Sequence, residues 1–338
     1  MGVRICCGRD TTLHDFSFIY TVLQALFHLN TFKSFILKDE SKKNENNFGK
    51  SLKEVFKDNI NIDLIKNSKF LYYKIKEINN GNIANFPSKI IILILDILNK
   101  EQSRKENENI NNKNLLSNIK NILNSNIYNN EQKTFYKYLE SLAINNNNNK
   151  IGELFYIFFQ KKIINNFQNN NYIIYEHKFV FELNLYNIFK EKSNNGTLIY
   201  NNQIPQLNEC INYISCIEQK FLYSTSAYLI FILNREGPEN YYYFGNFIYS
   251  KRIDLSSIIL REDNSKIYKL SSIIKEKKII PDINDNKESD DNYNFNYITI
   301  NMDNNGNFYY YENNEKISKI FIHNRYFDHI LIFKQEKG

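Results

Sequence analysis

Cysteine is scarce in this 338-residue chain, and no two cysteines are spaced as Cys-x-x-Cys. Cys6 and Cys7 are adjacent and cannot easily bridge one another, and the other two, Cys210 and Cys216, lie far along the chain. Neither a disulfide framework nor a zinc knuckle is indicated, so we expect no metal and no cofactor. This usage is typical of a reduced protein of the cytoplasm or nucleus.

Long apolar runs are also missing. No segment approaches the roughly 20 uninterrupted apolar residues of a membrane span, and no apolar signal region follows a basic start. The opening MGVRICC places Gly2 after the initiator Met, but Cys6 stands where a myristoylation signal needs Ser or Thr. Acylation of Cys6 or Cys7 and a short edge strand are the alternatives for this stretch. No membrane partner is expected.

The charge is modest and mixed in sign. The chain has a net charge of +6, and its lysines alternate with Asp and Glu instead of forming a basic stripe. A nucleic acid partner is therefore not directly indicated. With 42% hydrophobic residues, the chain can bury a sizeable core and is expected to be globular.

Residues 1–150 are dominated by apolar residues at helical spacing. The stretch FSFIYTVLQALFHLNTFKSFIL, residues 16–37, predicts one core helix with a strongly buried face. Further helices are predicted within 52–78, from Pro87 onward and over 132–144. The polar stretch 106–130 is predicted to be a mobile insertion.

Residues 151–338 change to the alternation typical of strands. Strands are predicted at 172–185, 226–233, 246–255, 267–274, 296–302, 306–312 and 327–334, and a helix around Cys210 and Cys216. Asp303-Asn304-Asn305-Gly306 supplies turn chemistry, so the strands on either side of it should form a hairpin.

Several of these stretches, in order, resemble the boxes of the ubiquitin-specific protease family. TVLQALFHLNTFKSFIL is similar to its nucleophile box, KIIILILDILNKE to its second box and IGELFYIFFQ to the stretch that opens its fingers. YEHKFVFELNL is similar to its Glu-x-Phe-x-x-Leu-x-Leu strand, and YLIFILNRE to a core strand. FNYITI and NFYYYENNEKI occupy its last two motifs. The resemblance implies an α+β, papain-like cysteine-protease fold in one domain over 1–338, with 1–150 as a helical thumb and 151–338 as β-rich palm and fingers.

The same resemblance implies where the chemistry of a cysteine protease should lie. It places Ser17 at the nucleophile position, Asn296 at the base position, Glu312 at the orienting position and Thr12 at the oxyanion position. A hydroxyl is harder to ionise than a thiol, and an amide cannot accept a proton near neutral pH. Glu312 keeps its charge but has no imidazole to orient, and Thr12 offers one donor.

The resemblance also implies a cleft for a ubiquitin tail, with Phe295, Asn296 and Tyr297 as its candidate lining. Phe295 stands where the family has a glycine. The fingers span IINNFQNNNYII has no cysteine, so the zinc of some family members is not expected.

No histidine takes over the base position in an evident way. His14 is the one histidine near Ser17 in sequence, His28 is expected in the core or at its boundary, and His323 and His329 are expected at the surface. Ser17 is then expected to cap its helix.

These observations favour a catalytically inactive relative of ubiquitin carboxyl-terminal hydrolases, which binds ubiquitin, a ubiquitinated protein or a protein assembly. One alternative is an active thiol-dependent deubiquitinase that uses Cys6 or Cys7 with His14. Another is the inactive, splicing-associated family branch of the tri-snRNP, to which YLIFILNR and Ile204-Pro205-Gln206 are similar. A third is an interaction module without ubiquitin contact.

Overall fold

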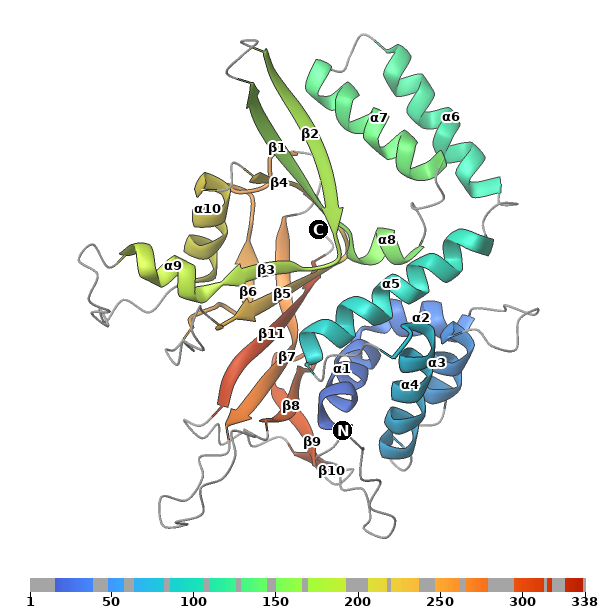
Figure 1. Cartoon of the computed structure of the whole chain (residues 1–338), viewed down its shortest axis with the longest axis vertical. Helices are drawn as coiled ribbons and strands as arrows, with labels where there is room; N and C mark the ends of the chain where they lie inside the picture. Colours follow the sequence, from blue (N-terminus) through green and yellow to red (C-terminus); the bar gives the residue numbers. More distant parts are fainter. Residues whose placement is uncertain are drawn as a thin grey trace. The chain divides into compact units, whose positions relative to one another are not determined.

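The computed structural model describes residues 16–38, 48–57, 64–81, 86–105, 110–125, 129–144, 150–165, 170–192, 206–217, 220–236, 247–261, 266–278, 295–312, 315–317 and 326–336. The helices are α1 (Ser17–His28), α2 (Asn30–Lys38), α3 (Phe48–Lys57), α4 (Leu64–Ile78), α5 (Pro87–Lys105), α6 (Ile110–Asn124), α7 (Asn130–Ile144), α8 (Lys150–Phe155), α9 (Leu185–Lys192) and α10 (Leu207–Ile217). The strands are β1 (Ile157–Asn165), β2 (Asn170–Lys178), β3 (Phe181–Asn184), β4 (Lys220–Thr225), β5 (Tyr228–Asn234), β6 (Arg252–Asp254), β7 (Ile267–Lys278), β8 (Phe295–Met302), β9 (Phe308–Glu312), β10 (Glu315–Ile317) and β11 (Tyr326–Gln335). The predicted α+β class is confirmed (Figure 1).

The chain divides into two compact units, and α5 and β7 each contribute to both. The first unit comprises Met1–Ile91 and Ile274–Phe327, and the second comprises Ile92–Ile273 and Asp328–Gly338. In the first unit the strand order is β10-β9-β8, followed by the end of β7. In the second unit, the order β7-β11-β5-β3 forms one set of strands, with β6 on β7, and β2-β1-β4 forms a separate sheet.

Helix α1 supplies much of the core of the first unit. Its apolar face is buried, including the predicted core residues Val22, Leu23 and Leu26, while Phe27 is half-buried with its ring edge-on to Phe56 at 5.2 Å. The prediction of one helix over 16–37 was wrong. Leu29 is extended, with φ −78° and ψ 92°, so the chain ends α1 and restarts as α2.

Three side-chain hydrogen bonds tie α1 to the β8–β9 hairpin (Figure 1). The Thr299 hydroxyl donates to the Thr21 carbonyl over 2.8 Å. The Nε2 atom of His28 lies 2.9 Å from the Met302 carbonyl oxygen, and its Nδ1 lies 3.0 Å from the Tyr309 hydroxyl. Because a carbonyl only accepts, Nε2 carries the proton and Nδ1 accepts from Tyr309. His28 is half-buried, as expected of a core or boundary histidine.

The predicted hairpin is confirmed. Strands β8 and β9 are antiparallel, with Ile300 paired to Tyr310 and Met302 to Phe308. At the turn Gly306 has φ +82°, and the backbone N–H of Asn307 donates to the Asp303 carboxylate over 2.8 Å. A positive φ is cheap for glycine, so the sequence Asp-Asn-Asn-Gly favours this chain reversal.

Strand β5 is the most deeply buried strand of the second unit. All six residues Tyr228–Leu233 are buried, because β11 pairs with one edge and β3 with the other while helices pack against it. A strand covered on both faces needs an unbroken apolar run, and YLIFIL is such a run. Strand β3 is separate from β2 and belongs to a different sheet, so the single strand predicted over 172–185 is two strands.

The β2-β1-β4 sheet is covered by α7 (Figure 1). The buried Phe135 ring lies 5.1 Å from Tyr175 of β2 and 4.5 Å from Tyr223 of β4. Tyr138 adds a hydrogen bond of 2.6 Å between its hydroxyl and His177 Nδ1. Residues 110–124, predicted to lie in a mobile insertion, instead form α6 against α7, and Ile119 is buried.

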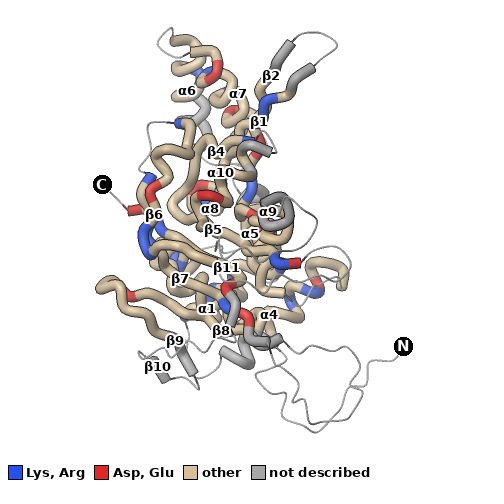
Figure 2. Tube along the Cα trace, turned by 90° about the vertical axis from the view of Figure 1, so that its left-hand side faces the viewer, with Lys and Arg blue, Asp and Glu red and all other residues tan. Residues whose placement is uncertain are grey.

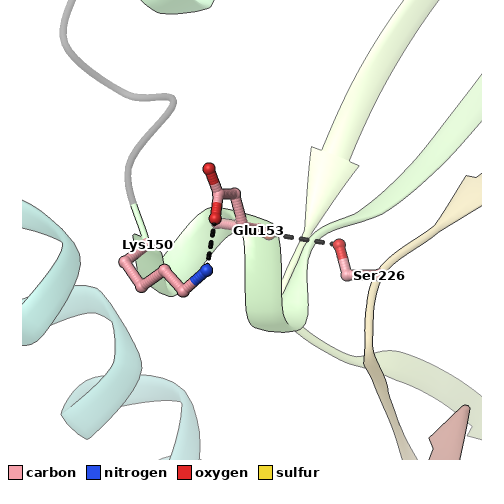
Figure 3. Close-up of polar contacts among 4 residues, drawn as sticks. Lys150, Glu153 and Ser226 are labelled. Carbon is pink, nitrogen blue, oxygen red and sulfur yellow. Dashed lines mark hydrogen bonds and ion pairs between the residues drawn. The ribbon is translucent and has the colours of Figure 1, made fainter. Parts of the chain in front are cut away.

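Helix α8 leads into β1 through a tight corner (Figure 3). The Ser226 hydroxyl donates to the carbonyls of Gly152 and Tyr156, and Lys150 forms an ion pair with Glu153. The Tyr156 hydroxyl donates to Asn99 of α5 over 3.1 Å. The Tyr156 ring is stacked on Phe179 at 5.1 Å, and it lies so close to Gly152 that a Cβ there would overlap it.

Gly152→Ala is expected to destabilise the protein by about 1–3 kcal/mol, because the buried Tyr156 ring cannot move away. In a Tyr156→Leu background the ring is gone, and the same substitution should instead stabilise by up to about 1 kcal/mol through helix propensity. Chemical denaturation of the four proteins measures both effects. An equal loss in the two backgrounds would contradict the overlap.

The His28 contacts predict a measurable coupling. His28→Phe and Tyr309→Phe should each lower the free energy of unfolding by about 1–2 kcal/mol, because each removes the part-buried hydrogen bond between the two side chains. The double variant should lose about 0.5–1.5 kcal/mol less than the sum, which a double-mutant cycle detects. Tyr73→Phe, at a residue 53% exposed, is the matched control and should change nothing. Purely additive losses would show that the pair does not interact.

Candidate functional site

The register of α1 along β8 brings the predicted nucleophile and base positions to the same end of the first unit. Thr21 lies beside Thr299, and His28 lies beside the end of β8 at Met302. The seven residues from Thr21 to His28 rise about 10 Å along the helix, and the three residues from Thr299 to Met302 span about the same length of strand. The helix and the strand therefore run side by side in the same direction. Ser17 begins α1 about 6 Å before Thr21, which is about two strand residues, and therefore lies level with Tyr297.

Asn296 and Phe295 thus lie next to the level of Ser17 along the backbone. Only the backbone of these three residues is described, and their roles remain predictions. By the register of α1 and β8, the two elements begin at about the same level.

Glu312, the predicted orienting position, ends β9 and is also described by its backbone alone. Extending the β8–β9 register by two residues beyond the Ile300–Tyr310 pair places Glu312 opposite Ile298. That is one diagonal step from Asn296, about 7–8 Å between backbones in an antiparallel pair. The sheet therefore brings the base and orienting positions to neighbouring places on adjacent strands.

Tyr297, the third predicted cleft residue, is 5% exposed. Its hydroxyl donates to Oε1 of the buried Glu276 of β7 over 3.2 Å. Thr299 and Asn301, on the same face of β8, are each 2% exposed. This face of β8 is therefore a buried polar layer, and a role of Tyr297 in a tail cleft stays a prediction.

The start of α1 is held by aromatic rings in place of a side-chain cap. The N-cap residue is Phe16, no side-chain cap hydrogen bond is present, and Ser17 is the first helical residue, so the predicted capping role of Ser17 was wrong. The rings of Phe16 and Phe18 both lie edge-on to Tyr72 of α4, at 5.4 and 5.9 Å. Nothing in the spacing of α4 identifies Tyr72 as this partner, because the contact joins segments far apart in sequence.

The described histidines do not supply a base at the head of α1 within the first unit. His28 lies 11 residues from Ser17, about 16 Å along a helix, and both of its ring nitrogens already form hydrogen bonds. In the second unit, burial lowers the pKa of His177, and burial with the nearby Arg235 lowers the pKa of His329 to about 4. His329 is half-buried within β11, so its predicted surface position was wrong.

Other predicted residues lie outside the described part of the chain. These are Thr12, His14, Cys6, Cys7 and His323. Cys210 is buried in α10, and this helix is the one predicted around Cys210 and Cys216. Among the residues that the structure describes, no group of three or more His, Cys, Asp or Glu could hold a metal ion. Within that same part of the chain, no helix is long and apolar enough to cross a membrane.

The buried polar layer beneath α1 was not predicted from the sequence. Thr299, Asn301 and Tyr309 all face the helix from the β8–β9 hairpin or lie on that face of it. In the sequence of β8, the polar residues Thr299 and Asn301 alternate with the apolar residues Ile300 and Met302, and all four are buried. That alternation is ordinarily taken as a solvent-exposed face.

Comparison by sequence finds no family model and no curated protein that matches this chain. Comparison by structure does find relatives. A structure of the SAGA DUB module with Ubp8, Sgf11, Sus1 and Sgf73 superposes with a TM-score of 0.62 at 12% identity, over 99% of this chain and 70% of the other. A structure of the yeast SAGA DUB module gives a TM-score of 0.61 at 12% identity, over 97% and 70%.

A third similar structure is the Ubp8/Sgf11/Sus1/Sgf73 module bound to ubiquitin aldehyde. It superposes with a TM-score of 0.59 at 11% identity, over 96% of this chain and 68% of the other. The identities are too low to carry an activity across, but the superpositions cover almost the whole chain. The chain therefore has the helix-plus-sheet fold of the Ubp8 deubiquitinase, as the sequence resemblance implied.

Proposed function

We propose that this chain is a catalytically silent protein of the ubiquitin-specific protease fold, and that it acts by binding ubiquitin, a ubiquitinated protein or a protein assembly in the nucleus or cytoplasm. The observation that carries the proposal is the substitution of every predicted catalytic position while the scaffold that would bring them together is kept.

The side chains at the proposed nucleophile and base positions support the absence of hydrolytic activity. Peptide or isopeptide hydrolysis by this fold needs a nucleophile and a base that takes its proton. Ser17 has a hydroxyl where a thiol is expected, and Asn296 has an amide, which cannot take a proton near neutral pH. Without a base, the Ser17 hydroxyl is a poor nucleophile even at a helix start.

The scaffold argues for a retained binding role. The α1–β8 contacts and the β8–β9 hairpin support this role, because they are the scaffold on which the three predicted positions would lie. One structural relative is bound to ubiquitin aldehyde and assembled with Sgf11, Sus1 and Sgf73. Binding of ubiquitin, or of an assembly partner, is the part of such a protein's work that needs no proton transfer.

Restoring the lost groups tests both halves of the proposal. Wild-type protein should form no covalent adduct with ubiquitin that carries a carboxyl-terminal electrophile, as judged by gel shift and mass spectrometry. Ser17→Cys/Asn296→His should form an adduct, because it supplies a thiol and an imidazole at the same end of the α1–β8 pair. Adding Phe295→Gly should speed the reaction by removing the ring beside the tail cleft.

The controls separate inactivity from loss of ubiquitin contact. Ser17→Cys alone should react far more slowly than the double variant, since no imidazole activates the thiol. Labelling of wild-type protein that disappears in Ser17→Ala would overturn the proposed silence. If no restored variant reacts and labelled ubiquitin does not bind at high concentration, the ubiquitin-binding role fails while the role in a protein assembly stands.

A further inference from the structure

Helices α3 and α4 of the first unit carry a large share of the net positive charge of the chain. These two helices pack against each other and together contain seven lysines and two glutamates, a net charge of +5. The whole chain has a net charge of only +6. The remainder of the chain therefore has a net charge of only about +1 (+6 less +5), and Figure 2 shows where the charged residues of the described chain lie.

The same region exposes large apolar side chains. Phe70 is 52% exposed, Tyr73 53%, Ile78 42% and Phe86 39%. Four of the seven exposed large hydrophobic residues in the described part of the chain thus lie within 17 positions of one another. Single exposed apolar residues need no explanation, but a group of them marks a contact surface.

Helix geometry places the two aromatic rings together on the outer side of α4. Leu71 and Ile75, four residues apart, are fully buried and define the inner face. Phe70 and Tyr73 are three residues apart and lie on the opposite side. Lys69 and Lys76, seven residues apart, flank them along the same edge. The result is an aromatic strip bordered by positive charge.

We propose that this basic aromatic face, formed by Phe70, Tyr73, Lys69 and Lys76 with the neighbouring lysines of α3, docks a partner protein through a segment rich in Asp or Glu and in apolar side chains. The aromatic rings supply the apolar contact area, and the net charge of +5 supplies attraction and orientation. The inference goes beyond the proposed function, because it holds whether or not the chain hydrolyses ubiquitin.

A protein segment fits this face better than a nucleic acid does. Glu54 and Glu77 lie among the lysines and form ion pairs with Lys57 at 3.0 Å and Lys74 at 3.2 Å, so these two lysines do not extend a continuous basic row of the kind that follows a phosphate backbone. The exposed aromatic rings lie beside the remaining lysines of α4. An acidic and apolar segment can contact both kinds of side chain.

A random peptide library displayed on phage, selected on the whole chain, identifies such a segment. Selection includes a counter-selection step on Phe70→Ser/Tyr73→Ser, so that only peptides specific to the face are kept. We expect the recovered peptides to combine Asp or Glu with Leu, Phe or Trp. The best peptide is then synthesised and its affinity measured by calorimetry.

Matched variants assign the binding to this face. Affinity should fall about tenfold or more in Phe70→Ser/Tyr73→Ser and in Lys69→Glu/Lys76→Glu, and it should weaken as salt is raised. Lys161→Glu/Lys162→Glu, a reversal of two exposed lysines on β1, should change it less than about twofold. Thermal melting should be unchanged in all three, since the substituted side chains are largely exposed.

Three results would overturn the proposal. One is recovery of peptides with no acidic bias, or of peptides that the variants bind as well as wild type does. A second is binding of poly(U) RNA that is lost in Phe70→Ser/Tyr73→Ser, which would assign the face to nucleic acid. The third is a dimer in sedimentation velocity that the same variant dissociates, which would assign it to a second copy of the chain.

Discussion

The packing of α1 along β8 is the constraint on which the rest of the first unit depends. The helix buries its apolar face, and its polar contacts with Thr299, Met302 and Tyr309 fix both its rotation and its register. An unpaired buried polar group costs about 1–3 kcal/mol, so a slip of either element is disfavoured several times over. This is why the start of α1 and the start of β8 stay level.

The packing of α1 along β8 fixes where the backbone lies, but it does not decide which reaction the side chains can perform. A fold positions backbones, and activity then depends on a few side chains placed on them. The chain keeps the Ubp8 fold at 12% identity, because buried apolar patterns and strand registers tolerate many sequences. Proton transfer, in contrast, requires particular side chains and is lost in most substitutions of them. If Ser17 and Asn296 stand at the nucleophile and base positions, as we propose, the groups on which hydrolysis depends are missing although the α1–β8 contacts are present.

The sequence predicted the elements whose signals are local. The buried run of β5, the Asp303–Gly306 turn and Pro87 at the start of α5 each follow from residues within a few positions. It missed the break at Leu29, the helix α6 and the packing of Phe16 against Tyr72 at the start of α1. Each of these depends on contacts with distant segments, such as α6 on α7 or Phe16 on Tyr72. At the candidate site, the positions followed from the family resemblance, whereas the polar layer beneath them required the fold.

The most direct measurement is hydrolysis of ubiquitin-rhodamine by purified wild-type protein beside Ser17→Ala. With no thiol at the head of α1 and no imidazole at Asn296, both proteins should release rhodamine at the rate of buffer alone, over the range of pH in which a histidine base would titrate. Turnover by the wild-type chain that Ser17→Ala abolishes would show that the serine is a working nucleophile, and would contradict a silent site.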